Sequence, residues 1–102
     1  MFAHINIWTL NDEGSSTDDT ASREIGTQLS KQPGFQSYSV IRTGPRELVA
    51  ITMFDSEDHL QLATQSLASF VHARVGRYTA GEPERRRGDV LYHASSPTGP
   101  VT

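Results

Sequence analysis

The sequence predicts an α+β domain whose elements follow the order β-α-β-β-α-β. Three observations predict it. Residues 35–43 and 47–54 each alternate between apolar and polar side chains on either side of Gly44-Pro45, a pattern typical of a β-hairpin. A helical pattern precedes Pro33-Gly34, and a second one follows Asp55-Ser56. Alternating segments near both ends supply the outer strands of a ferredoxin-like sandwich, with a four-stranded antiparallel sheet and two helices on one face.

The first strand is predicted over residues 2–10. Ile5 and Ile7 point to one side of it, and the other side carries Phe2, His4, Asn6, Trp8 and Leu10. Residues 11–17 form a polar loop in which Ser16 or Thr17 caps the first helix, and Asp18 and Asp19 occupy its first turn. An apolar stripe of Ala21, Ile25 and Leu29 gives this helix one buried face.

The second helix is predicted from Ser56 to about Val75, with Gly76 at its end. Its inward residues are Leu60, Ala63, Leu67, Phe70, Val71 and Val75. Residues 77–87 are predicted to be a loop in which residues 85–87, three arginines, are solvated or alternatively clamp an anionic substrate. The fourth strand is predicted over residues 89–94. One domain therefore spans residues 1–94, and residues 95–102 form a flexible tail.

Bulk composition excludes several classes of function. The chain has 102 residues, enough for one domain, and its net charge of −3 does not favour binding to nucleic acid or to an anionic membrane. It contains no cysteine, which excludes disulfides, thiolate catalysis and cysteine-based metal sites. No long apolar run or signal peptide is visible, so we expect a soluble, cytoplasmic protein.

The sheet is predicted to have two apolar faces, although two helices can cover only one of them. On the first strand, Ile5 and Ile7 point to one face of the sheet, whereas Phe2 and Trp8 point to the other. The two hairpin strands also carry apolar residues on both faces. An apolar sheet face of this size is rarely left in water. We therefore expect a homodimer in which two copies pack sheet to sheet.

Four features of the chain occur together in one known family. They are the order of the elements, Pro33-Gly34-Phe35 after the first helix, Arg42 at the end of the second strand, and Phe54-Asp55-Ser56-Glu57 at the start of the second helix. In these the chain resembles, over residues 1–94, the antibiotic-biosynthesis-monooxygenase (ABM) domains of the dimeric α/β-barrel superfamily. The resemblance implies a sheet-to-sheet dimer. Members range from cofactor-free oxygenases of polycyclic phenols to haem-degrading enzymes, and many carry a tryptophan where Phe54 stands.

The haem-degrading branch provides a comparison of individual residues. Those enzymes place an asparagine on the first strand, matched by Asn6, and a haem-ligating histidine near the end of the second helix, matched by His72. Their tryptophan midway along that helix has no counterpart, because Leu62 or Ala63 stands there and the only tryptophan is Trp8. A neutral imidazole can ligate haem iron, so the resemblance implies haem binding by His72 as one alternative.

Candidate site residues concentrate on the first strand and the second helix. An imidazole and an amide side by side can orient a phenol or an oxyanion, so His4 and Asn6, together with His72, are the catalytic candidates. The candidates for contact with a substrate are Trp8, Tyr38, Arg42, Phe70 and Tyr92. The alternative for most of these side chains is packing in the core or between subunits.

The fourth strand is expected to pair with the first, which would bring Tyr92 or His93 beside His4 and Asn6, depending on register. His4 and His93 lack a third ligand, so no metal site is predicted.

Three functions remain open from the sequence. The first is a small monooxygenase that uses no bound cofactor and acts on a small aromatic or phenolic substrate, with His4 or His72 accepting a proton. The second is a non-catalytic dimer that binds a small ligand or a partner. The third is a haem-binding or haem-degrading protein that uses His72.

Overall fold

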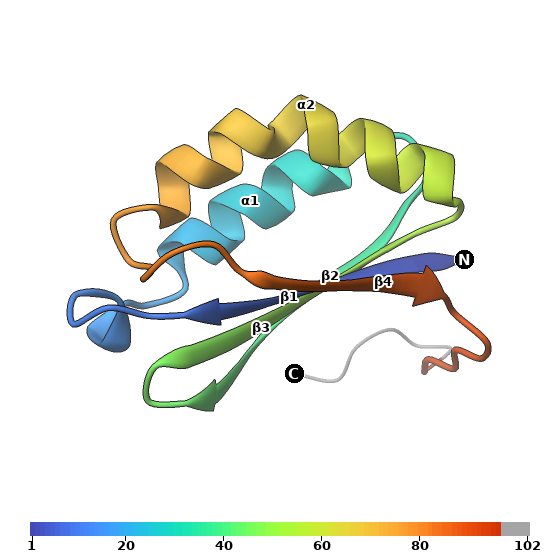
Figure 1. Cartoon of the computed structure of the whole chain (residues 1–102). Coiled ribbons are helices and arrows are strands. Elements are labelled where there is room, and N and C mark those ends of the chain that lie inside the picture. The colour runs from blue at the N-terminus through green and yellow to red at the C-terminus, as the bar shows by residue number, and fades with distance from the viewer. Residues whose placement is uncertain (97–102) are drawn as a thin grey trace.

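The computed structural model describes residues 1–96 and has the predicted order of elements (Figure 1). The strands are β1 (Phe2–Thr9), β2 (Phe35–Gly44), β3 (Glu47–Phe54) and β4 (Glu84–Asp89). The helices are α1 (Thr20–Ser30) and α2 (Glu57–Val75), and a 3₁₀ turn, η1 (Gly14–Ser16), lies between β1 and α1. The α+β prediction is therefore confirmed.

The four strands form one antiparallel sheet in the order β2-β3-β1-β4. This is the predicted ferredoxin-like order, with β1 and β3 in the centre and β2 and β4 at the edges. The register of β1 on β3 pairs His4 with Thr52, Asn6 with Ala50, and Trp8 with Leu48. Because directly paired residues point to the same side of a sheet, these six side chains share one face.

Both helices lie on that same face of the sheet (Figure 1). The buried core between them and the sheet consists of Ile25, Leu29, Phe54, Leu60, Ala63 and Leu67. Phe54 is fully buried at the end of β3, and its ring meets the edge of Phe35 at a centroid distance of 5.8 Å. The predicted inward face of the second helix is confirmed, since Phe70, Val71 and Val75 also pack against this core.

Helix α2 begins as predicted. The Ser56 side chain accepts a hydrogen bond from the backbone N–H of His59, and Glu57 and Asp58 occupy the first turn. The predicted start of the first helix is wrong, because α1 begins only at Thr20. Its first residues are held by Asp18, whose Oδ1 accepts the N–H of Thr20 at 3.0 Å, so neither Ser16 nor Thr17 is the cap.

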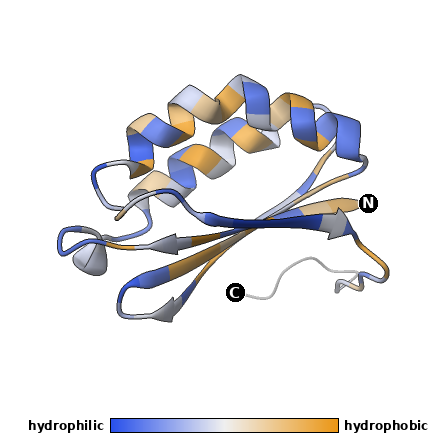
Figure 2. Ribbon diagram, viewed as in Figure 1, coloured by the Kyte–Doolittle hydropathy of each residue, from blue (hydrophilic) through white to orange (hydrophobic). Residues whose placement is uncertain are grey.

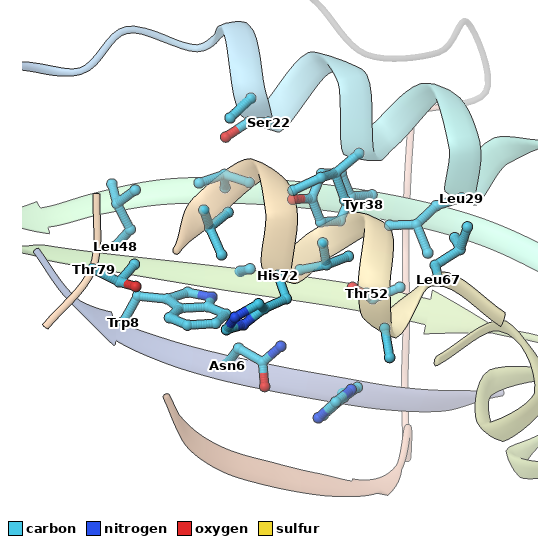
Figure 3. Close-up of a pocket in the computed structure, with 18 of the residues that line it drawn as sticks. Asn6, Trp8, Ser22, Leu29, Tyr38, Leu48, Thr52, Leu67, His72 and Thr79 are labelled. Atoms are coloured by element: carbon cyan, nitrogen blue, oxygen red, sulfur yellow. The ribbon is translucent and has the colours of Figure 1, made fainter. Parts of the chain in front are cut away.

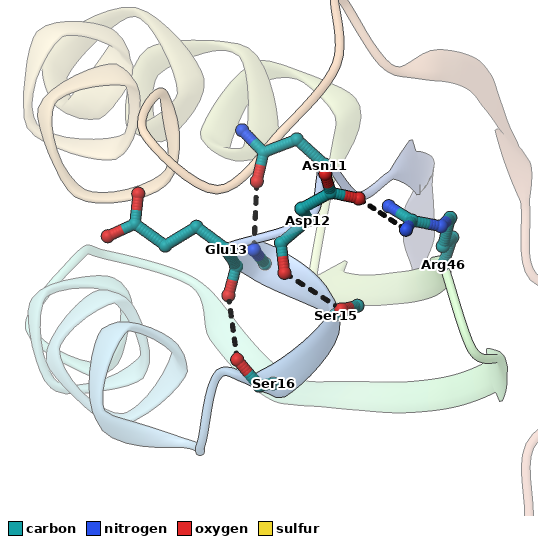
Figure 4. Close-up of polar contacts among 7 residues, drawn as sticks. Asn11, Asp12, Glu13, Ser15, Ser16 and Arg46 are labelled. Atoms are coloured by element: carbon teal, nitrogen blue, oxygen red, sulfur yellow. Dashed lines mark hydrogen bonds and ion pairs between the residues drawn. The ribbon is translucent and has the colours of Figure 1, made fainter.

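The connection from β1 to α1 is organised by Asn11 (Figure 4). Its Oδ1 accepts the N–H of Gly14 at 2.8 Å, and its Nδ2 donates to the carbonyl of Arg77 at 2.8 Å. The neighbouring Asp12 pairs with Arg46 from the β2–β3 hairpin. This loop is therefore tied both to the segment after α2 and to the hairpin.

The predicted fourth strand, residues 89–94, is wrong. The strand that pairs with β1 is β4, so Arg85, Arg86 and Arg87 belong to the sheet rather than to a loop. An edge strand pairs on one side only, and charged side chains there discourage pairing with other chains. Figure 2 shows β4 as the most hydrophilic strand. Leu91 and Tyr92, whose alternation suggested a strand, are 97% and 84% exposed beyond its end.

The face of the sheet opposite the helices carries Ala3, Ile5 and Ile7 of β1 paired with Met53, Ile51 and Val49 of β3. Within residues 1–96, no helix packs against this face of the sheet (Figure 1). The chain thus has the second apolar face that its sequence predicts. Of the predicted flexible tail, only Ser95 and Ser96 are described, and both are exposed; residues 97–102 lie outside the described residues. None of the described helices has the length and apolar character needed to cross a membrane.

Candidate functional site

A cavity of about 550 Å³ lies between the two helices and the sheet (Figure 3). Its walls are mainly apolar side chains of α1, α2, β2 and β3, among them Ile25, Leu29, Val40, Leu48, Ala63 and Leu67. Pockets of this size, apolar with a few converging polar groups, are typical of small-molecule sites. The polar groups are therefore the part that decides its chemistry.

Strand β1 supplies the floor of the cavity with His4, Asn6 and Trp8. The sequence placed these three residues on one side of a strand but did not decide whether that side meets the helices. It does, because the same side of β1 carries Phe2, whose partner across the strands is the buried Phe54. The alternation of a single strand thus lines up an imidazole, an amide and an indole under the helices.

Two polar atoms on this floor have no hydrogen-bond partner within the protein. Among residues 1–96, the buried side-chain atoms without one are His4 Nε2 and Asn6 Oδ1, two residues apart on β1. Leaving such an atom without any partner costs about 1 to 3 kcal/mol, so these two atoms are expected to pair with water or with a ligand. When His4 carries its proton on Nδ1, both atoms are acceptors, so a ligand hydroxyl could donate its one proton to either of them, and the other would need a second donor such as water.

The environment of His4 keeps it uncharged. Burial lowers its pKa below 6.5, and the positive charges of Arg87 and then Arg85 on the neighbouring strand lower it further. The imidazole is therefore neutral at pH 7, which is the form that accepts a proton. Tyr38 is also held neutral, because burial raises its pKa to about 12.

Helix α2 contributes His72 to the opposite wall. Figure 3 shows its side chain reaching toward Asn6 and Trp8 from the helix above them. The sequence matched Asn6 and His72 to two residues of haem-degrading enzymes, and both line this one cavity. No other observation on the described residues singles out haem, so haem ligation by His72 stays a prediction.

The remaining predicted contact residues are divided between the cavity and its surroundings. Tyr38 lines the cavity, whereas Arg42 lies at an adjoining groove and donates to the carbonyl of Thr17. Phe70 packs against the core under the guanidinium of Arg74, 4.4 Å from its ring centroid. The predicted placement of Tyr92 beside His4 and Asn6 is wrong, because Tyr92 follows β4 and is exposed to solvent.

Strand β4 contributes arginines that were not among the predicted site residues, although the sequence offered residues 85–87 as an alternative clamp for an anionic substrate. His4 is paired with Arg87 and Asn6 with Arg85, so arginines stand where Tyr92 or His93 were expected. Arg85 lines the cavity together with Glu82, and Thr52 of β3 lies beside His4. The register of β4 was the missing information, since a strand predicted five residues too late brings the wrong side chains to the site. Within residues 1–96 no three His, Asp or Glu side chains form a group that could hold a metal ion.

The arrangement can bind and deprotonate an aromatic hydroxyl compound. Trp8 offers a flat apolar surface for a ring, and Asn6 and neutral His4 offer acceptors beside it. Of the side chains on this floor, neutral His4 has the chemistry of a general base, and its Nε2 has no partner within the protein.

Comparisons with solved structures agree with this fold. The chain matches a proposed antibiotic biosynthesis monooxygenase from Nitrosomonas europaea with a TM-score of 0.76 and 14% sequence identity. The match covers 90% of this chain and 100% of that protein's chain. Rv0793 from Mycobacterium tuberculosis matches over 92% and 98% of the two chains, with a TM-score of 0.76 and 20% identity. The N63A mutant of SnoaB, a cofactor-independent oxygenase from Streptomyces nogalater, matches over 93% and 97%, with a TM-score of 0.73 and 16% identity.

These likenesses show that the chain has the ferredoxin-like fold of the ABM proteins, as its sequence predicts. At such low identities they show the fold alone, because one fold supports many functions. No protein-family model and no curated protein matches the sequence. The function must therefore be argued from the cavity.

Proposed function

We propose that the protein is a small ABM-like monooxygenase that acts without a bound cofactor on a small aromatic or phenolic substrate. The observation that carries the proposal is the pair of unpartnered acceptors, His4 Nε2 and Asn6 Oδ1, on the floor of an apolar cavity. The shared fold with SnoaB, which is a cofactor-independent oxygenase, supports the choice of chemistry.

In the proposed reaction the substrate hydroxyl points at the floor of the cavity. His4 Nε2 takes the hydroxyl proton, while Asn6 and Trp8 hold the ring in place. The phenolate is electron-rich enough to reduce O₂ directly. One oxygen atom enters the ring and the other leaves as water, so a phenol and O₂ give a quinone and water. The substrate supplies all four electrons, and the reaction needs no external reductant.

Oxygen uptake tests this proposal. Wild-type protein is incubated with a panel of naphthols and hydroxyanthracenes, and the products are identified by mass spectrometry. His4→Gln should lower kcat/KM by about a hundredfold or more, since a positioned general base typically contributes that much. His59→Gln is the matched control, because His59 lies outside the cavity in a pair with Asp55 at 2.6 Å.

Two results would contradict the enzyme proposal. Binding of the phenols without oxygen uptake would indicate the non-catalytic ligand-binding alternative. Uptake that is unchanged in His4→Gln would show that another group accepts the proton. A haem titration of the same protein tests the remaining alternative, since a Soret band lost in His72→Ala would support haem ligation.

We also propose that two copies associate through the uncovered sheet face. The support is the row of Ala3, Ile5 and Ile7 packed beside Met53, Ile51 and Val49, which no described helix covers. Sedimentation analysis should give a dimer for the wild type and a monomer for Ile51→Glu. Leu62→Glu, at an exposed position on α2, is the control that should stay dimeric. A wild-type monomer at micromolar concentration would refute the proposal.

A further inference from the structure

Strand β4 places two arginines on the cavity side of the sheet. Arg87 is paired with His4 and Arg85 with Asn6, so both side chains share the face of the unpartnered acceptors. Arg86, between them, is paired with Ile5 and therefore belongs to the opposite face. The alternation puts two of the three consecutive arginines on the face of the sheet that carries the site, where Arg85 lines the cavity and Arg87 stands next to it, and one on the opposite face.

Arg85 and Arg87 make few strong interactions with other groups of the protein. Arg85 is joined to Glu82 at 3.3 Å, and both side chains are more than half exposed. Arg87 lies 5.7 Å from the ring centroid of Phe2 and has no ion pair among residues 1–96. Arg86, in contrast, is bound to Glu84 at 2.7 Å and to a backbone carbonyl at 2.9 Å. Arg85 and Arg87 therefore keep donors available to a ligand.

The β4 edge beside the cavity carries a net positive charge. Arg85 and Glu82 line the cavity, whereas Arg87 stands beside it on the same face of β4, so this edge carries two positive charges and one negative charge. Asp18 is the other carboxylate of the lining and belongs to the segment before α1. Both arginines lie close enough to the polar floor for their positive charges, after burial, to lower the pKa of His4. A ligand with one negative charge would neutralise this end of the site.

We propose that the substrate is a hydroxylated aromatic carboxylic acid, whose carboxylate is held by Arg85 and Arg87 while its hydroxyl faces His4 and Asn6. This inference rests on the proposed function and narrows its substrate class. A guanidinium binds a carboxylate through two parallel N–H···O bonds, which fixes the orientation of the ligand as well as its charge. Since paired residues lie on adjacent strands, the carboxylate and the hydroxyl are expected on neighbouring carbons of the ring.

Calorimetric titration with 3-hydroxy-2-naphthoate and with its methyl ester tests the inference. The wild type should bind the acid about ten to a hundred times more tightly than the ester, the range expected for hydrogen bonds to a charged group. In Arg85→Gln and Arg87→Gln this preference should fall to near unity. Arg86→Gln is the matched control and should keep the full preference. Arg85→Lys should recover only part of it, because it restores the charge but not the fork.

The outcomes separate this inference from the function on which it rests. Equal binding of acid and ester by the wild type would overturn the carboxylate subsite and leave the phenol site intact. An equal loss in Arg86→Gln and Arg85→Gln would also overturn it, since only the total charge would then matter. If neither compound binds, both the subsite and the proposed phenol site are refuted. Thermal melts of each variant establish that the edge strand is still folded.

Discussion

Replacement of Asn6 by leucine tests the cavity without relying on any reaction. Leucine has nearly the shape of asparagine but brings no polar atom. If Asn6 Oδ1 is unpartnered in the free protein, its removal relieves a penalty of about 1 to 3 kcal/mol. Water that enters the cavity offsets part of this penalty, so we expect a gain near the lower limit, about 1 kcal/mol. For a chain of this length that raises Tm by roughly 4 to 8 °C.

Asn11 offers a matched comparison, since these are the two asparagines of the chain. The side chain of Asn11 makes two hydrogen bonds, to Arg77 and Gly14, each 2.8 Å long. Asn11→Leu should therefore lose about 1 to 2 kcal/mol of stability, allowing about 1 kcal/mol per bond and some replacement by water. The same substitution thus has opposite signs at two positions, which thermal and urea denaturation of both variants can measure.

Ligand binding distinguishes two causes of a stability gain in Asn6→Leu: removal of the unpaired polar atom and a higher strand propensity. Leucine also favours a strand more than asparagine does, so a gain in stability alone is insufficient. The stabilisation of the wild type by 3-hydroxy-2-naphthoate should be reduced in Asn6→Leu and unchanged in Asn11→Leu. The reasoning is refuted if Asn6→Leu destabilises the free protein, or if it responds to the ligand as the wild type does.

Three further predictions follow from the same structure. Gly34→Ala should cost at least about 2 kcal/mol, because Gly34 has a φ of 81° and a Cβ there would lie 2.5 Å from His59 Nδ1. Gly81→Ala, with a φ of 84° and open space around it, should cost only about 1 kcal/mol in urea denaturation. Phe54→Ala should cost about 3 to 5 kcal/mol, since its ring is fully buried; a loss under 1 kcal/mol would contradict the assigned core. The lowered pKa of His4 predicts that kcat/KM rises with pH through that pKa and then levels off. Stability should fall as pH drops below 6.5, because the unfolded chain binds the proton first. In His4→Gln the rise in kcat/KM should disappear and the loss of stability below pH 6.5 should become shallower.

The hairpin and the second helix were predictable because several local signals coincide there. Alternation, the Gly44-Pro45 turn and the Ser56 cap all indicate the same boundaries, and the structure has β2, β3 and α2 at those positions. The start of α1 was predicted too early because Ser16, Thr17, Asp18 and Asp19 are all suitable capping residues, and local sequence does not rank them.

The fourth strand was not predictable from apolar alternation, because its six residues are all exposed. Its pairing depends on the free edge of β1 rather than on burial of its own side chains. The same error moved Tyr92 into the predicted site and left Arg85 out of it. The residues on β1 were placed together correctly, because strand parity alone decides which of them share a face.

The position of the site on the sheet also explains how one small domain can combine fixed and adaptable groups. Strand β1 is paired on both sides, with β3 and β4, so His4 and Asn6 are held on a rigid floor. The arginines stand on an edge strand that pairs on one side only, and their long side chains can adjust to a ligand. A reaction that requires exact placement of one hydroxyl group is best served by the rigid strand. The long side chains of Arg85 and Arg87 can adjust until a guanidinium meets the carboxylate, so an edge strand suits this part of the proposed site.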